Sequence, residues 1–186
     1  MVPSLTTILQ CFSGEWAALL QPDAILTVCS KIGYTAWRDR LLTPVTTVQL
    51  FLLQILHGNT ACSHLPHLSG LRFTAAAYCQ ARARLPLRLF ALLLERFGSA
   101  VQRFALDEGR WHGHRTFLVD GSGGSMPDTP ALQDAFGQPT VQRPGCGVPV
   151  ARLLGLFHAG TGVLLKLVVA PLLTHALARV QAVHPA

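Results

Sequence analysis

Long uninterrupted hydrophobic runs are missing from this 186-residue sequence, although 50% of its residues are hydrophobic and only 13% are charged. The most apolar stretch, residues 153–173, is broken by His158, Gly160, Gly162 and Lys166, whereas a membrane-spanning helix needs about 18 or more apolar residues in a row. The N-terminal residues also lack the basic start of a secretory signal peptide. We therefore expect a cytoplasmic protein that has no membrane partner and has ample material for a hydrophobic core.

Cysteine pairs with the spacing of a metal site are absent as well. The five cysteines are scattered along the chain, and no CxxC pair occurs among Cys11, Cys29, Cys62, Cys79 and Cys146. This pattern argues against a zinc site and favours buried free thiols.

Lysine is scarce, since Lys31 and Lys166 are the only lysines among 15 basic residues and the net charge is +6. Arginine presents a planar fork that binds phosphate groups bidentately, which suits a nucleic-acid partner. A high-GC genome also encodes arginine in preference to lysine, and the abundant Ala, Leu and Gly fit that explanation. The arginine excess alone therefore does not decide between the two.

Helical patterns fill the first part of the chain. The clearest covers residues 43–58, which begin with Thr43 as an N-cap and Pro44 at the first helical position and continue with a broad apolar face. Further helices are predicted at residues 15–20, 23–32 and 87–104.

Residues 61–85 have the pattern of a helix-turn-helix. A short helix at 62–68 is followed by Ser-Gly, by Thr74 as an N-cap, and by a second helix at 75–84. Pro66 breaks the usual spacing of such a motif.

The second of these helices carries Gln80, Arg82 and Arg84. In DNA-binding proteins of this shape the second helix enters the major groove, where Gln and Arg side chains reach base edges. We identify the three residues as candidate DNA contacts. A solvated face in an ordinary helical bundle explains them equally well, so both interpretations stay open.

A polar, glycine-containing break at residues 107–114 precedes a change from helical to strand patterns. We place the domain boundary there, with a helical domain at 1–110 and a second domain at 111–186. Three strands and a last helix are predicted in the second domain, at residues 115–119, 150–158, 163–170 and 174–183. The proline-rich segment 121–149 is predicted to be mostly loop.

Asp120 directly follows the first predicted strand and precedes a glycine-rich stretch, residues 121–125. A buried carboxylate costs free energy unless hydrogen-bond donors or a metal ion satisfy it. The dinucleotide fingerprint, the phosphate-binding loop and the esterase elbow all fail here, because the third glycine, the lysine and the framed serine that they need are absent. Two interpretations remain: a strand-borne metal ligand, or a structural aspartate that caps the turn through its own backbone.

The sequence VDGSGGSMPDTPALQDAFGQP resembles the region around the first catalytic aspartate of DDE transposases from bacterial insertion sequences. In that family a hydrophobic strand ends in Asp-Gly-Ser/Thr, and Ser-x-Pro-Asp-Thr-Pro and Ala-Phe-Gly-Gln-Pro segments follow. The matching segments here are residues 120–122, 125–130 and 135–139, and PGCGVPVARLLGLF at 144–157 is also similar. The likeness runs from about residue 37 to the last residue.

The resemblance implies an α+β protein, in which an N-terminal all-α bundle precedes the first three antiparallel strands and the first helix of an RNase H-like catalytic domain. It implies DNA cleavage and strand transfer, with two divalent metal ions, usually Mg²⁺, that activate water or a 3′-hydroxyl group. By the same resemblance Asp120 is the first of three metal-binding catalytic acids. The implied partner is DNA at insertion-sequence ends, and a homo-oligomer is compatible with it.

The sequence departs from the family beyond this point, because no Asp or Glu follows Asp134. The second and third family acids are not matched, and Asp128 and Asp134, in the predicted loop, are poor substitutes. We therefore expect an N-terminal fragment of a transposase that does not assemble the two-metal site, or cut DNA, by itself. The alternative is a non-enzymatic DNA-binding or interaction fragment that modulates a full-length transposase.

Overall fold

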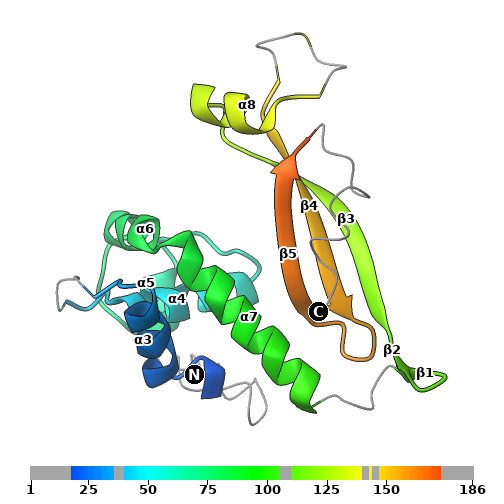
Figure 1. Ribbon diagram of the computed structural model, residues 1–186. Coiled ribbons are helices and arrows are strands. Elements are labelled where there is room, and N and C mark those ends of the chain that lie inside the picture. Colours follow the sequence, from blue (N-terminus) through cyan, green and yellow to red (C-terminus); the bar gives the residue numbers. More distant parts are fainter. Residues whose placement is uncertain (1–17, 36–39, 105–109, 140–142, 144–146, 173–186) are drawn as a thin grey trace. The chain divides into compact units, whose positions relative to one another are not determined.

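The computed structural model describes residues 18–35, 40–104, 110–139, 143 and 147–172. The chain divides into two compact units, Met1–Arg96 and Phe97–Ala186. Helices come first in the described part and an antiparallel three-stranded sheet follows (Figure 1), so the predicted α+β class is confirmed at this level. The predicted domain boundary near residue 110 stays a prediction.

The described helices of the first unit begin where the sequence places local capping signals. They are α3 (Pro22–Lys31), α4 (Pro44–Leu56), α5 (Leu65–Ser69), α6 (Ala75–Arg84) and the first part of α7 (Leu87–Phe104). The hydroxyl group of Thr43 accepts a hydrogen bond from the N–H of Thr46 at 3.2 Å, and that of Thr74 accepts one from Ala77 at 3.1 Å. These side chains satisfy N–H groups that the first turn of a helix leaves unpaired.

The helix predicted at residues 62–68 is shorter than expected and starts only at Leu65. Pro66 explains the difference, because proline is tolerated in the first turn of a helix but clashes with the preceding turn inside one. The helix ends at Gly70, whose φ of 70° lies in the left-handed region. Of the helix predicted at 15–20, the first three residues lie outside the described ranges.

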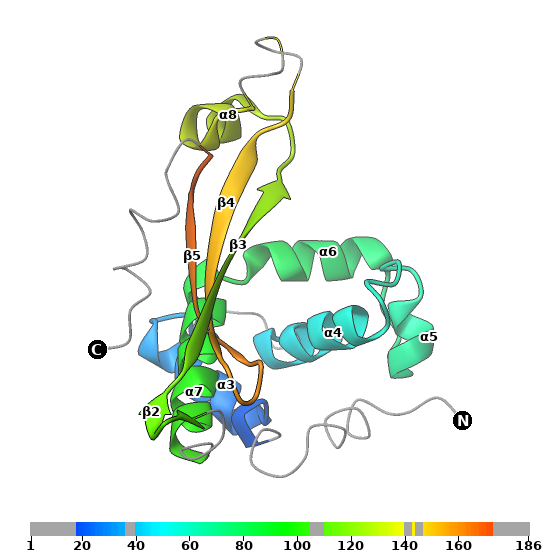
Figure 2. The ribbon, with the colours of Figure 1, turned by 90° about the vertical axis from the view of Figure 1, so that its right-hand side faces the viewer.

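The core of the helical unit forms around α4, which contacts α3, α5 and α6. Figure 2 shows α6 packed beside α4. One cluster joins α3, α4 and α7 through Ile25, Val28, Cys29, Val48, Leu85, Leu89 and Leu93. A second joins α4, α5 and α6 through Leu50, Leu53, Leu65 and Tyr78. The apolar face predicted for residues 43–58 therefore packs into both clusters.

The described cysteines are free thiols, as predicted, but they are not all buried. Cys29 is buried, Cys62 is half-buried, and Cys79 is exposed on α6, where its thiol donates to the sulfur of Cys62 at 3.7 Å. The prediction of burial is wrong for Cys79, because this side chain faces outward from α6 beside the equally short side chain of Cys62. Cys11 and Cys146 lie outside the described residues.

The second unit contains the sheet β3–β4–β5, made of β3 (Phe117–Ser125), β4 (Val150–His158) and β5 (Leu164–Pro171). Both pairings are antiparallel. The turn between β4 and β5 forms at the predicted Gly-Thr-Gly, where Gly162 has a φ of 66° and donates its N–H to the carbonyl oxygen of His158 at 2.8 Å. A small hairpin, β1 (Arg110–Trp111) and β2 (His114–Arg115), replaces part of the predicted break.

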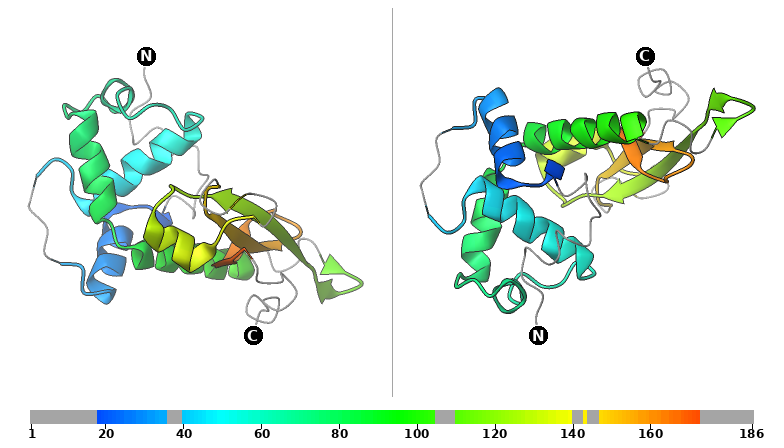
Figure 3. Two further views of the ribbon diagram at one scale, coloured as in Figure 1. Left: turned by 90° about the horizontal axis from the view of Figure 1, so that it is seen from above. Right: turned by 90° about the horizontal axis from the view of Figure 1, so that it is seen from below.

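The prediction for the glycine-rich stretch is wrong, because β3 continues through it to Ser125. Nine consecutive residue pairs join β3 to β4, so backbone hydrogen bonds to the neighbouring strand hold residues that have little strand preference of their own. The segment after it also contains α8 (Pro130–Phe136), which is capped by Thr129 and lies at one end of the sheet (Figure 1); the left view of Figure 3 looks at the sheet from that end. The helix predicted at 174–183 lies outside the described residues.

Helices long and apolar enough to cross a membrane are not found in the described ranges.

Candidate functional site

Asp120 lies in the middle of β3 and not at a strand end, directly opposite Gly155 of β4. Its carboxylate is exposed, and Oδ1 accepts a hydrogen bond from the N–H of Gly121 at 2.8 Å. A Cβ atom at Gly155 would lie 2.7 Å from the Phe157 ring, which therefore fills the space beside this position. Asp120 is thus an accessible carboxylate on an extended strand, and the glycine beside it does not form the expected turn.

Other acids do not gather around Asp120 in the part of the chain that the structure describes. No group of three or more His, Cys, Asp or Glu side chains is placed there to hold a metal ion. Asp128 accepts a hydrogen bond from the Gln133 side chain at 2.9 Å, and Asp134 is exposed on α8. Hard cations such as Mg²⁺ prefer oxygen ligands, so Asp120 has suitable chemistry for one ligand, but these residues do not fit a two-metal site.

The three candidate DNA contacts on α6 do not share one face. Gln80 and Arg84 are one helical turn apart and both are exposed, whereas Arg82, between them, is half-buried. Residues four apart lie above one another on a helix, while a residue two positions away lies on nearly the opposite side. The structure therefore brings Gln80 and Arg84 together and directs Arg82 elsewhere.

Arg82 points to the contact between α6 and α4. Its guanidinium group donates to Oε1 of Gln54 at 3.1 Å, and the Tyr78 hydroxyl donates to the same oxygen at 2.9 Å. The guanidinium carbon also lies 5.8 Å from the ring centre of Phe51 and 5.6 Å from that of Tyr78, within the range of a cation–π contact. Burial raises the pKa of Tyr78, and the nearby Arg82 cation opposes that rise.

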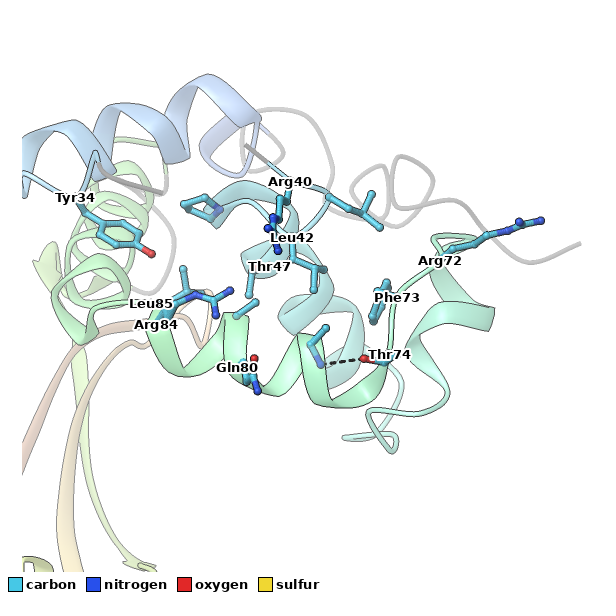
Figure 4. A pocket seen from close by; sticks show the side chains of 14 residues that line it. Tyr34, Arg40, Leu42, Thr47, Arg72, Phe73, Thr74, Gln80, Arg84 and Leu85 are labelled. Atoms are coloured by element: carbon cyan, nitrogen blue, oxygen red, sulfur yellow. Dashed lines mark hydrogen bonds between the residues drawn. The ribbon is translucent and has the colours of Figure 1, made fainter. Parts of the chain in front are cut away.

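Gln80 and Arg84 line a pocket of about 730 Å³ between α6 and the segment that leads into α4. Three arginines, Arg40, Arg72 and Arg84, lie along it, and no Asp or Glu is among its lining residues. Figure 4 shows the guanidinium groups of Arg40 and Arg84 directed toward the hollow, while Arg72 points away from it. The arrangement is a basic depression that suits an anionic ligand.

Sequence reasoning missed Arg40, Arg72 and Gln54. Arg40 and Arg72 precede the N-caps Thr43 and Thr74 by only a few residues, outside any helical period. The sequence does place a basic residue shortly before each N-cap. It does not show that the residues around the two N-caps line the same pocket. Gln54 interrupts an apolar face, which was a signal for a buried polar contact.

Comparisons with known proteins give one partial likeness. No protein-family model matches the chain, and no solved structure matches it significantly. A stretch of 71 residues, 38% of this chain, is 35% identical to the protein named "Putative transposase InsZ" of Escherichia coli (strain K12). The matched stretch is 23% of that relative, so the similarity spans about a quarter of its length. This distant and partial similarity indicates a relation to transposases.

Proposed function

We propose that the chain is a transposase-related protein whose helical unit binds DNA and whose Asp120 is the first metal-binding acid of an RNase H-like catalytic domain. The observation that carries the proposal is the 35% identity over 71 residues to the Escherichia coli relative. The basic pocket on the helical unit, lined by three arginines and no acid, supports DNA as the partner.

The order of elements in the second unit supports the assignment of Asp120. In the three-stranded sheet, the strand that carries this residue comes first in the chain, and the other two antiparallel strands come after α8. An RNase H-like domain also begins with three antiparallel strands, and its first acid lies on the first of them. The segments that resemble transposases, at residues 120–122, 125–130 and 135–139, follow in the same stretch of the chain.

Divalent metal ions would supply charge stabilisation for in-line attack on a DNA phosphate group. Asp120 offers one exposed carboxylate to such an ion, and the described residues add no second acid beside it. A complete site needs further ligands, so we derive no catalytic step from Asp120 alone. This solitary acid also favours a second candidate function, a DNA-binding protein that modulates a full-length transposase without cutting DNA itself.

Asp120→Asn tests the proposal. In an active form that contains this sequence, the substitution is expected to lower strand cleavage by about 100-fold or more, because a charged group that stabilises the transition state is lost. DNA binding is expected to persist, because the arginine-lined pocket lies in the other unit. Nicking of supercoiled plasmid in Mg²⁺ and fluorescence anisotropy with labelled duplex DNA measure the two activities.

Asp134→Asn is the matched control, since it removes the same charge from the exposed surface of α8. Equal loss of cleavage in both variants, or full cleavage by Asp120→Asn, would remove Asp120 from the proposed role. Unchanged DNA binding with no cleavage by any form would leave the modulator function as the better account.

A further inference from the structure

The arginines that line the pocket beside α6 have guanidinium groups without partners among the described residues. Within the described residues, the guanidinium groups of Arg40, Arg72 and Arg84 make no hydrogen bond or ion pair. Other arginines of the same unit are used internally: Arg82 donates to Gln54, and Arg96 donates to the carbonyl oxygen of Ala24 at 3.0 Å. The donors of the pocket are thus available to an external ligand.

We infer that this pocket is the site at which the helical unit holds backbone phosphate groups of DNA, with Arg40 and Arg84 as their ligands. This inference rests on the proposed function and specifies which surface and which side chains carry DNA binding. A guanidinium fork matches the paired oxygens of a phosphodiester, and each such contact releases condensed counterions from the DNA.

The two arginines come from separate elements that converge on one hollow. Arg40 precedes α4, and Arg84 is the last residue of α6. Figure 4 shows both guanidinium groups directed into the same space, with the side chains of Leu42, Thr47 and Leu85 beside it. Backbone phosphate groups that enter the hollow would therefore meet one guanidinium group from each of the two elements.

The position of Arg84 depends on how α6 is fixed to α4. Gln54 of α4 accepts a hydrogen bond from Tyr78, which lies one helical turn after the N-cap of α6. It accepts another from Arg82, which lies two turns after the N-cap. These bonds set the rotation of α6 about its own axis, so that Gln80 and Arg84 face the pocket. Arg82 is therefore a positioning residue for the phosphate site and not one of its ligands.

A second hollow of about 660 Å³ adjoins the first, and both are lined by Arg72, Phe73 and Thr74. Arg72 points away from the first hollow (Figure 4), so its guanidinium group is placed outside the Arg40–Arg84 pair. Adjacent hollows with basic side chains suit a chain of phosphate groups better than one small anion. This feature favours polymeric DNA over free phosphate or a mononucleotide as the ligand.

The test measures duplex DNA binding by the full chain at salt concentrations from about 50 to 200 mM. Each phosphate contact contributes about 0.9 to the log–log salt slope, so Arg40→Ala and Arg84→Ala should each lower the slope by about that amount and the double variant by about twice as much. Arg84→Lys keeps the charge and should keep most of the slope. Arg88→Ala is the matched control, because Arg88 is exposed on α7 outside both hollows.

The outcomes separate this inference from the function on which it rests. If the wild-type chain does not bind DNA, the proposed function fails. If it binds but the slopes of the Arg40 and Arg84 variants equal those of wild type or of Arg88→Ala, DNA binds elsewhere and the inference is overturned. If a mononucleotide competes at the same concentration as duplex DNA, the pocket binds small anions and the inference is overturned. If Arg82→Ala lowers the salt slope without a loss of stability, Arg82 contacts phosphate and its positioning role is wrong.

Discussion

Gln54 is the buried polar residue that joins α4 to α6. It is 8% exposed, its Nε2 donates to the carbonyl oxygen of Thr60 at 2.9 Å, and its Oε1 accepts from Tyr78 and Arg82. Because both polar atoms of the amide have partners, its burial carries little cost in free energy. The same bonds select one orientation of α6 among those that the apolar contacts alone would allow.

Gln54→Leu is expected to lower the free energy of unfolding by about 1–3 kcal/mol, because it leaves the buried hydroxyl of Tyr78 without an acceptor. Tyr78→Phe removes a donor but leaves Oε1 bonded to Arg82, so its expected cost is about 1 kcal/mol. Urea unfolding followed by circular dichroism measures both. A greater loss in Tyr78→Phe than in Gln54→Leu would contradict the assigned role of the amide.

At the scale of elements, the C-terminal part of α7 lies against β5 within the sheet unit. Gly98 is buried there, and a Cβ atom at this position would lie 3.0 Å from the carbonyl oxygen of Leu165. Glycine lowers the intrinsic stability of a helix interior by about 1 kcal/mol relative to alanine. The close approach of the two backbones explains why glycine suits this position despite that cost.

Gly98→Leu is expected to destabilise the sheet unit by about 1–3 kcal/mol, because the side chain must displace α7 from β5. Gly98→Ala should gain none of the usual helix stabilisation, since its Cβ meets a backbone oxygen that cannot move independently. Thermal unfolding measures both, with Ser99→Leu as the control because Ser99 is exposed on the same helix. Equal melting temperatures for Gly98→Leu and Ser99→Leu would show that α7 and β5 do not approach so closely.

For the molecule as a whole, the described groups with resolved pKa shifts all lie in the helical unit. Burial raises the pKa of Cys29 and of Tyr78, and the hydrogen bond to Cys62 is the main cause of the raised pKa of Cys79. In each case folding favours the neutral form. The ordinary pKa values are about 8.5 for cysteine and 10 for tyrosine. Below these values the three side chains are neutral in both the folded and the unfolded chain, so ionisation does not reduce the stability of the folded state.

We expect the helical unit to lose stability as the pH rises above about 8.5, because the unfolded chain ionises at these groups before the folded chain does. Urea unfolding at several pH values, followed by the helical circular dichroism signal, measures the loss. Cys29→Ala combined with Tyr78→Phe should be less stable at pH 7 but should show a shallower decline. Stability that is level up to pH 11 would count against the burial of both groups.

The sequence by itself determined the elements whose signals are local. The bounds of α6, α7 and β4 agree with the prediction, and α4 begins at the predicted Pro44, because N-cap hydroxyls, a first-turn proline and an apolar period act over a few residues. The relation to transposases also came from a contiguous stretch around Asp120. The RNase H-like fold, the metal role of Asp120 and the helix-turn-helix stay predictions.

Only the tertiary structure decided where the polar side chains go. β3 continues through glycines with little strand preference because β4 supplies nine paired partners, so Asp120 lies within a strand. Arg82 turns toward Gln54, and Arg84 lines the same pocket as Arg40, because the packing of α6 on α4 fixes which face of each helix is covered. The positions of these side chains depend on contacts between residues that are far apart in the sequence. Such residues come together only when the apolar clusters form, so no local sequence pattern predicts the contacts.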